Sequence, residues 1–165
     1  MKDVTVVDPH ITIVPVNITN LSKYLDVLVD LYNQAIDKNN TYLTELHLNA
    51  KLLNGKPADA KHLIGEISRL NINEFQVLFI DDKPIGFISY SPVRSTVLDI
   101  VWFFVKYEYR NLGYGKQLFT RAMEYGKKNK VDYIQCTCTA NDWPVRAVMS
   151  SYNGIISNVT MTVKL

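Results

Sequence analysis

Hydrophobic positions along the chain change their spacing several times, and each change marks an expected element. Apolar residues alternate over 10–16, which predicts a first strand. From Leu21 to about Asp37 they recur every three or four positions, which predicts an amphipathic helix. A second, short helix is expected over 44–53 and a third over 58–70, on either side of the helix-ending pair Asn54-Gly55.

The second half of the chain returns to the two-residue spacing of strands, with two helices between them. Strands are expected over 75–80 and 85–90, joined by a short hairpin, and a third over 97–105. Next come a helix from Lys116 to Lys128, a strand over 131–139, a short helix over 144–151, and one or two strands within 155–165.

This element order predicts an α/β fold in a single domain spanning residues 1–165. The strands 97–105 and 131–139 flank one crossover helix, so they should pair in parallel, whereas the hairpins make the other pairs antiparallel. We therefore expect a mixed, mostly antiparallel sheet of six to seven strands with one central parallel pair, flanked by about four helices.

Composition and charge narrow the class of protein without naming an activity. The chain is 47% hydrophobic and 21% charged, with a net charge of +2, which is too small to argue for nucleic acid. It shows neither the apolar core of a signal peptide nor an apolar stretch of about 20 residues that could span a bilayer. Cys136 and Cys138 lie two apart in a predicted strand and complete no metal-binding cluster, so we read them as reduced structural thiols. These features predict a cytoplasmic protein with no membrane, nucleic-acid or metal partner.

The most informative segment is the glycine-punctuated loop 109–116, which lies between a buried strand and a helix. Such a loop directs backbone N–H groups outward at the positive end of a helix dipole, which suits a phosphate or pyrophosphate. It lacks the third glycine and the following acidic residue of a dinucleotide site. It is not a P-loop either, because Gln117 follows Gly115-Lys116 and the upstream glycine is missing.

The string from Val105 to Gly115, VKYEYRNLGYG, resembles the acyl-coenzyme A loop of the GNAT superfamily of N-acetyltransferases. Tyr107 stands where the family usually has proline. The resemblance implies acetyl-CoA as the cofactor, with its pyrophosphate on the loop and its pantetheine arm between splayed strands on either side. The cofactor-binding residues would be Val105, Arg110, Asn111, Leu112, Gly113, Tyr114, Gly115, Lys116 and Asn141.

Asp99 is the candidate catalytic base, because it is the only ionisable residue of the strand 97–105. It alternates in phase with Val101, Phe103 and Val105, and a carboxylate within an apolar strand is costly unless it is paired or functional. In the histone-acetylating members a catalytic glutamate lies eleven positions before the loop's first residue, as Asp99 does before Arg110. The alternative is a structural carboxylate that pairs with a neighbouring strand.

Tyr152 is the candidate proton donor to the departing thiolate. Many family members carry a tyrosine four residues before a Gly-Phe pair, whereas here Ser150 precedes Gly154 by four and Tyr152 by two. A tyrosine that only packs at the end of a helix is the alternative.

Acceptor recognition is expected from the region 30–65 and from the C-terminal strands. The substrate-binding candidates are Tyr32, Tyr42, Glu45 and Trp102, although each also fits an ordinary core or surface position.

Together these features predict an acetyl-CoA-dependent N-acetyltransferase that acts on a primary amine of a small molecule, peptide or protein, by direct attack in a ternary complex. Another acyl donor or a hydroxyl acceptor is a second hypothesis. A third is a non-catalytic, GNAT-like module that binds acyl-CoA as a regulator or binds a partner protein. The segment after Gly154 could also pair across a homodimer.

Overall fold

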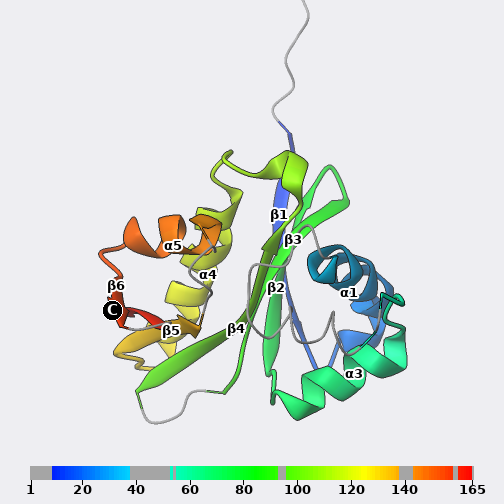
Figure 1. Cartoon of the computed structure of the whole chain (residues 1–165), viewed down its shortest axis with the longest axis horizontal. Helices are drawn as coiled ribbons and strands as arrows, with labels where there is room; N and C mark the ends of the chain where they lie inside the picture. Colours follow the sequence, from blue (N-terminus) through cyan, green and yellow to red (C-terminus); the bar gives the residue numbers. More distant parts are fainter. Residues whose placement is uncertain are drawn as a thin grey trace, which may run out of the picture.

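The protein is built around one seven-stranded sheet that carries helices on both faces (Figure 1). The computed structural model describes residues 9–37, 53, 55–92, 96–137, 143–157 and 160–164. Its elements, in chain order, are β1 (Ile11–Asn17), α1 (Leu21–Ile36), α3 (Ala60–Arg69), β2 (Glu74–Ile80), β3 (Lys83–Tyr90), β4 (Val97–Val105), the 3-10 helix η1 (Tyr107–Tyr109), α4 (Tyr114–Lys128), β5 (Tyr133–Thr137), α5 (Trp143–Ser150), β6 (Ile155–Ser157) and β7 (Thr160–Lys164).

The strand order confirms the mixed, mostly antiparallel sheet. It runs β1-β2-β3-β4-β5-β7-β6, and of the strand pairs described only β4 and β5 run parallel. The α4 crossover joins these two strands, as expected from the order strand, helix, strand. The fold class read from the sequence is therefore correct.

The ends of several elements differ by one or two residues from the sequence-based expectation, and those of α4 and β5 have a clear physical reason. Helix α4 begins at Tyr114, two residues before the expected Lys116, because Gly113 at φ 87° supplies the left-handed N-cap. Strand β5 begins at Tyr133 instead of Val131, because the Val131 N–H still caps α4 by donating to the Gly126 carbonyl. The helix expected over 44–53 falls almost wholly outside the described residues.

The two faces of the sheet are covered by different helices. Helices α1 and α3 lie on one side, and α4 and α5 lie on the other (Figure 1). Beneath α1, the indole of Trp102 is fully buried and lies 5.0 Å from the Tyr32 ring, among the rings of Phe75 and Phe87. Beneath α4, the core includes Phe119 and Ile134. We call these sides the α1 face and the α4 face.

A bulge in β4 exchanges the two faces partway along the strand. Tyr90 pairs with Ile100 whereas its neighbour Ser89 pairs with Trp102, so Val101 is an extra residue in β4. Because paired side chains share a face, Ile100 lies on the α4 face and Trp102 on the α1 face. Asp99, next to Ile100, therefore lies on the α1 face, and Phe103 lies on the α4 face. The regular alternation that placed Asp99 in phase with Phe103 is wrong at this point.

Strands β4 and β5 are paired over only part of their length. The parallel register runs from Val97↔Tyr133 to Ile100↔Cys136 and ends there. On its other side β4 remains paired with β3 up to Val105. The second half of β4 thus has an edge toward β5 that no described strand occupies, and we call the opening beside this edge the V.

Within the described residues, no helix combines the length and apolar character needed to cross a bilayer. No group of three or more His, Cys, Asp or Glu side chains is placed to hold a metal ion in the same part of the chain.

Candidate functional site

The loop between β4 and α4 leaves the first amide groups of the helix without partners inside it. The first bond that closes α4 is donated by the Gln117 N–H to the Gly113 carbonyl, at 3.2 Å. The N–H groups of residues 114–116 precede this bond, and no side chain in the described part of the protein caps the helix. Asn111 (φ 60°) and Gly113 (φ 87°) turn the chain into this position. The result is a row of free donors at the positive end of the helix dipole, which favours an anion.

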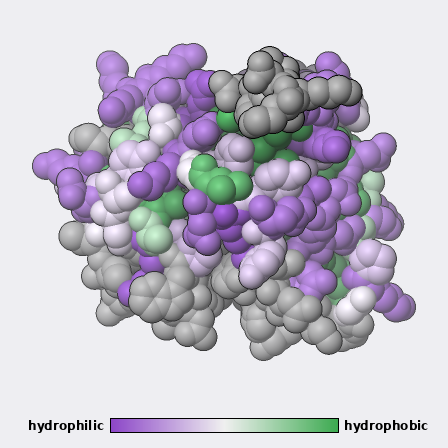
Figure 2. Space-filling view, turned by 90° about the horizontal axis from the view of Figure 1, so that it is seen from above, coloured by the Kyte–Doolittle hydropathy of each residue, from purple (hydrophilic) through white to green (hydrophobic). Residues whose placement is uncertain are grey.

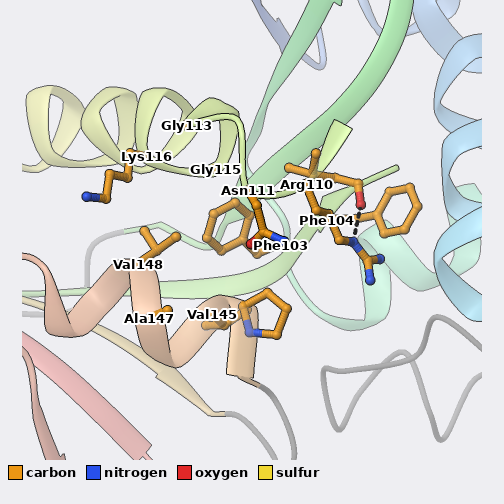
Figure 3. Close-up of a pocket in the computed structure, with 12 residues that line it drawn as sticks. Phe103, Phe104, Arg110, Asn111, Gly113, Gly115, Lys116, Val145, Ala147 and Val148 are labelled. Atoms are coloured by element: carbon orange, nitrogen blue, oxygen red, sulfur yellow. Dashed lines mark hydrogen bonds between the residues drawn. The ribbon is translucent and has the colours of Figure 1, made fainter. Parts of the chain in front are cut away.

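A pocket of ≈ 500 Å³ lies next to this helix end. Figure 3 shows the Phe103 ring between α4 and α5, whereas the Phe104 ring lies on the opposite side of β4. The residues that line the pocket come from the end of β4, the loop and α5: Phe103, Phe104, Val105, Arg110, Asn111, Gly113, Gly115, Lys116, Pro144, Val145, Ala147 and Val148. The lining residues include two cations and no carboxylate. The pocket thus combines an apolar wall with a positively charged mouth.

Figure 2 views the molecule from above the orientation of Figure 1, and this side of the surface is mostly hydrophilic with small hydrophobic patches. In the loop region before α4, Tyr107 is 74% exposed and Leu112 is 62% exposed. Neither they nor Tyr114 are among the residues that line the pocket.

Gly115 lies where the pocket narrows. A Cβ atom on this residue would lie 3.3 Å from Val148 Cγ2 and 3.6 Å from Phe103 Cζ. Any longer side chain would therefore enter the space between α4 and α5. Glycine at this position therefore keeps the space between α4 and α5 open.

Arg110 fastens the loop to the end of β4. Its Nε–H donates to the Val105 carbonyl at 2.9 Å, as Figure 3 shows. Its guanidinium carbon lies 5.9 Å from the centre of the Phe104 ring and 5.6 Å from that of Tyr107. Two aromatic faces and a carbonyl thus hold the arginine in place, and part of its role is to fix the loop.

The free edge of β4 offers backbone groups to a ligand inside the V. The Lys106 N–H donates to Ile85 in β3, so residues 104 and 106 direct their backbone polar groups toward β3. By alternation, residues 103 and 105 direct theirs toward β5 and the opening. Arg110 occupies the Val105 carbonyl. The N–H and C=O of Phe103 and the N–H of Val105 remain directed into the V.

Asp99 lies at the closed end of the V, on the α1 face. It pairs with Gln135 across the parallel register, one position before that register ends. The Gln135 amide donates a hydrogen bond to Asp99 Oδ1, and the Asp99 side chain is partly exposed. The pocket wall at Phe103 lies four residues further along β4 and on the opposite face. Asp99 is therefore not among the residues that line the pocket.

The structure places the other predicted site residues as follows. Tyr32 and Trp102 are both buried, 1% and 0% exposed, so they contribute to the aromatic core beneath α1. Tyr152 lies against α4, with its hydroxyl 3.0 Å from Thr120 Oγ1, and it does not line the pocket. Tyr42, Glu45 and Asn141 lie outside the described residues.

The sequence reading missed the α5 wall of the pocket, formed by Pro144, Val145, Ala147 and Val148, and the ring of Phe103. Small apolar residues on a short helix are also typical of an ordinary core. Only the tertiary placement of α5 opposite Gly115 shows that they line a pocket. For Phe103 a signal existed, because it lies two residues before Val105 on the strand that leads into the loop.

The chain belongs to the acetyltransferase (GNAT) family. The sequence profile of that family matches residues 40–151, which is more than half of the chain. The match includes the loop, the V and all of α5. Among curated proteins, none matches the chain significantly.

Solved structures with the same fold include several acetyltransferases. A ribosomal-protein-alanine N-acetyltransferase from Brucella melitensis is 16% identical with a TM-score of 0.67, covering 92% of this chain and 99% of that chain. The PaiA N-acetyltransferase from Thermoplasma acidophilum, in complex with coenzyme A, is 20% identical with a TM-score of 0.63, covering 94% and 99%. A protein from Salmonella typhimurium, solved with its cofactor acetyl-CoA, is 12% identical with a TM-score of 0.68, covering 94% of both chains. At these identities the likeness establishes the shared fold.

Proposed function

We propose that the protein transfers the acetyl group of acetyl-CoA to a primary amine, by direct attack of the amine in a ternary complex. The observation that carries this proposal is the V between β4 and β5. The helix end and the apolar pocket lie on one face beside it and the partly exposed Asp99 carboxylate lies on the other, so the donor and the amine would meet at this opening. Acetyl-CoA is the donor in this family, and relatives of the same fold hold coenzyme A and acetyl-CoA.

The residues of the pocket fit the chemistry of this donor from end to end. Helix N–H groups 114–116 and the cation Lys116 suit a diphosphate. The Phe103 and Val148 side chains suit an apolar arm, and the free edge of β4 can pair with amide groups along it. When bound, acetyl-CoA supplies a thioester carbonyl carbon that is open to attack and a thiol leaving group. The closed end of the V is the place for that carbonyl.

Asp99 would act as the base on the amine. An alkyl amine with a pKa near 10.4 is neutral in only about one molecule in 2,500 at pH 7, and only the neutral form attacks. As the new N–C bond forms and the C–S bond breaks, the proton of the amine passes to Asp99 and the sulfur leaves with the electron pair. A positioned carboxylate contributes about 10²- to 10⁴-fold to such a step.

The position of Cys136 supports direct transfer over a covalent acyl-enzyme. Its side chain is 1% exposed and shares the α4 face with Ile100, opposite Asp99. Its thiol donates weakly to the Thr137 carbonyl at 3.8 Å. A thiol buried in this way is a poor nucleophile.

Tyr152 stays a prediction as the donor to the leaving thiolate. Its hydroxyl contacts Thr120 on the outer side of α4, so it would need to turn from that partner to reach the sulfur. Asn141 and Glu45 likewise stay predictions, for cofactor and acceptor contacts respectively.

The test is the release of free thiol from acetyl-CoA with a panel of primary amines, for the wild type and for Asp99→Asn. We expect turnover with at least one amine and a loss of about 10²-fold or more in kcat for the variant, with coenzyme A affinity unchanged. Asp82→Asn, which changes an exposed carboxylate in the β2–β3 turn, is the matched control. Coenzyme binding without turnover for any amine would instead favour the acyl-CoA-sensing module.

A further inference from the structure

Gln135 is a polar side chain beside the reacting region that neither the loop motif nor the pocket explains. It lies in the middle of β5 and is partly exposed on the α1 face. We propose that Gln135 is the positioning residue for the Asp99 carboxylate, holding one of its oxygens so that the other faces the amine. This inference rests on the proposed acetyl transfer.

The contact joins two strands that are far apart in the sequence. Gln135 Nε2 donates to Asp99 Oδ1 across 36 residues of chain. The Asp99 main chain is fixed independently, because its carbonyl accepts the Ser91 N–H at 3.1 Å. Both the backbone and one carboxylate oxygen are therefore held. Among the described residues, Asp99 Oδ2 has no hydrogen-bond partner, so it is the oxygen available to an acceptor.

A neutral amide is well suited to this role. It donates a hydrogen bond without carrying a charge, so it orients the carboxylate and leaves its negative charge to accept a proton. A lysine at this place would form an ion pair that competes with the incoming amine, and a glutamate would repel the carboxylate. Asp99 is also one carbon shorter than a glutamate, so its reach depends strongly on its rotamer.

The position of the pair explains why one contact can matter. Asp99 and Gln135 form the second-to-last rung of the parallel register before the V opens at Ile100 and Cys136. At the closed end of the V, a small rotation of the carboxylate changes whether it faces the opening. Misplacement of a reacting group by about 1 Å can cost about 10²-fold in rate.

A purely structural bridge between β4 and β5 is the competing explanation, and the two make different predictions. A bridge that holds the V together would affect thermal stability and coenzyme binding. A positioning contact would affect kcat and depend on the presence of Asp99.

The experiment compares four proteins with the wild type: Gln135→Met, Asp99→Asn, the double variant, and Gln34→Met. Gln34 is a matched control, because its amide also donates to an aspartate, Asp30 Oδ2 at 2.8 Å, on the exposed side of α1. We expect Gln135→Met to lower kcat about 10- to 100-fold with KM for acetyl-CoA within about twofold. The double variant should lose no more than Asp99→Asn alone, and Gln34→Met should match the wild type.

Four other results would contradict the positioning role of Gln135, and they can be told apart. A wild-type kcat for Gln135→Met overturns the positioning role and leaves the proposed function standing. A double variant that is slower than Asp99→Asn by the full factor of Gln135→Met also overturns it, because Gln135 would then act independently of Asp99. If the wild type transfers acetyl to no amine, both proposals fail. If Gln135→Met does not fold cooperatively, Gln135→Glu is measured instead, and a wild-type kcat for that variant overturns the positioning role.

Discussion

The α4 face and the α1 face of the sheet share strand β4, yet they differ in which parts of the chain form the candidate site. On the α4 face the site is mostly backbone: helix N–H groups, two glycines and the free edge of β4. On the α1 face the proposed site is a side-chain pair, Asp99 and Gln135, and the same face carries the buried rings of Tyr32 and Trp102. Backbone recognition suits a donor that never changes, whereas side chains can be exchanged to suit different acceptors.

Three substitutions test whether the two faces have these different roles. If they do, changes on the α4 face alter coenzyme affinity or stability, and matched changes elsewhere do not.

The largest effect is expected from Gly115→Leu. The new side chain would enter the gap in which a Cβ already lies 3.3 Å from Val148 Cγ2, so coenzyme A affinity should fall about 10- to 100-fold. Isothermal titration calorimetry measures this directly. Gly65→Leu is the control, because Gly65 lies in α3 with nothing within 4 Å of its Cβ position. Equal affinities for the two variants would show that the pocket does not hold the coenzyme.

A smaller effect is expected from Arg110→Leu. It removes the hydrogen bond to the Val105 carbonyl and the contacts with two aromatic rings, so the loop loses its anchor. Hydrogen bonds from charged groups contribute about 1.5–3 kcal/mol, and coenzyme affinity should fall about tenfold. Arg121→Leu removes the same charge from the outer side of α4, where Arg121 pairs with Glu124 at 2.9 Å. If both variants lose affinity equally, the cause is overall charge and not the anchor.

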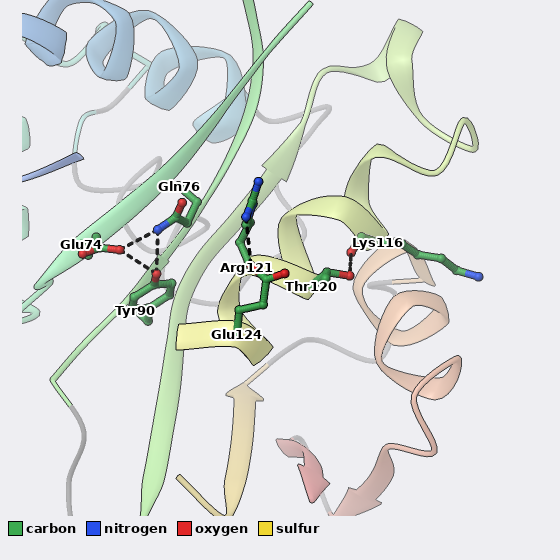
Figure 4. A network of polar contacts seen from close by, with 7 residues as sticks. All are labelled: Glu74, Gln76, Tyr90, Lys116, Thr120, Arg121 and Glu124. Carbon is green, nitrogen blue, oxygen red and sulfur yellow. Dashed lines mark hydrogen bonds and ion pairs between the residues drawn. The ribbon is translucent and has the colours of Figure 1, made fainter. Parts of the chain in front are cut away.

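The smallest effect is expected from Tyr90→Phe, which tests the α4 face away from the coenzyme. Figure 4 shows the Tyr90 hydroxyl bonded to Gln76 at 2.9 Å and to Glu74 at 3.0 Å. Loss of these bonds should lower the free energy of unfolding by about 1 kcal/mol, with kcat unchanged. Urea titration measures this change.

The same residue gives a pH dependence of known sign. Burial raises the pKa of the Tyr90 hydroxyl well above its ordinary value of 10.0. In the unfolded chain this tyrosine ionises near pH 10, whereas in the folded protein it stays protonated. Its contribution to stability is therefore fully present below pH 10 and is lost as pH rises beyond it. Stability should fall less steeply above pH 10 in Tyr90→Phe than in the wild type, and Tyr107→Phe, at an exposed tyrosine, should follow the wild type. Parallel curves for all three proteins would contradict the burial argument.

The sequence predicted the fold well where local patterns decide it. The bounds of β4, Val97–Val105, were predicted as they are found, because a long apolar run between turns permits few alternatives. The parallel pairing of β4 and β5 followed from the crossover helix. The loop was recognisable because its glycines are required locally, at Gly113 by a positive φ and at Gly115 by the nearness of Val148.

The remaining features of the site depend on contacts between distant segments. The bulge at Val101 is visible only in the pairing of β4 with β3, and it changes the face on which Asp99 lies. The bond from Gln135 to Asp99 depends on the register between two strands. The burial of Trp102 and Tyr32 against each other likewise follows from packing, since aromatic residues suit both cores and binding sites. Spacing along the chain carries no information about any of these contacts.

The extra residue at Val101 has a consequence for how such a protein can diverge. Because the alternation of β4 shifts by one residue there, Asp99 before the bulge lies on the α1 face and Phe103 after it lies on the α4 face. On the proposed assignment of the two sites, a lineage could alter the residues around Asp99 and acquire a new acceptor while the donor site beside Phe103 stays the same. One inserted residue thus allows the two halves of the strand to change independently of each other.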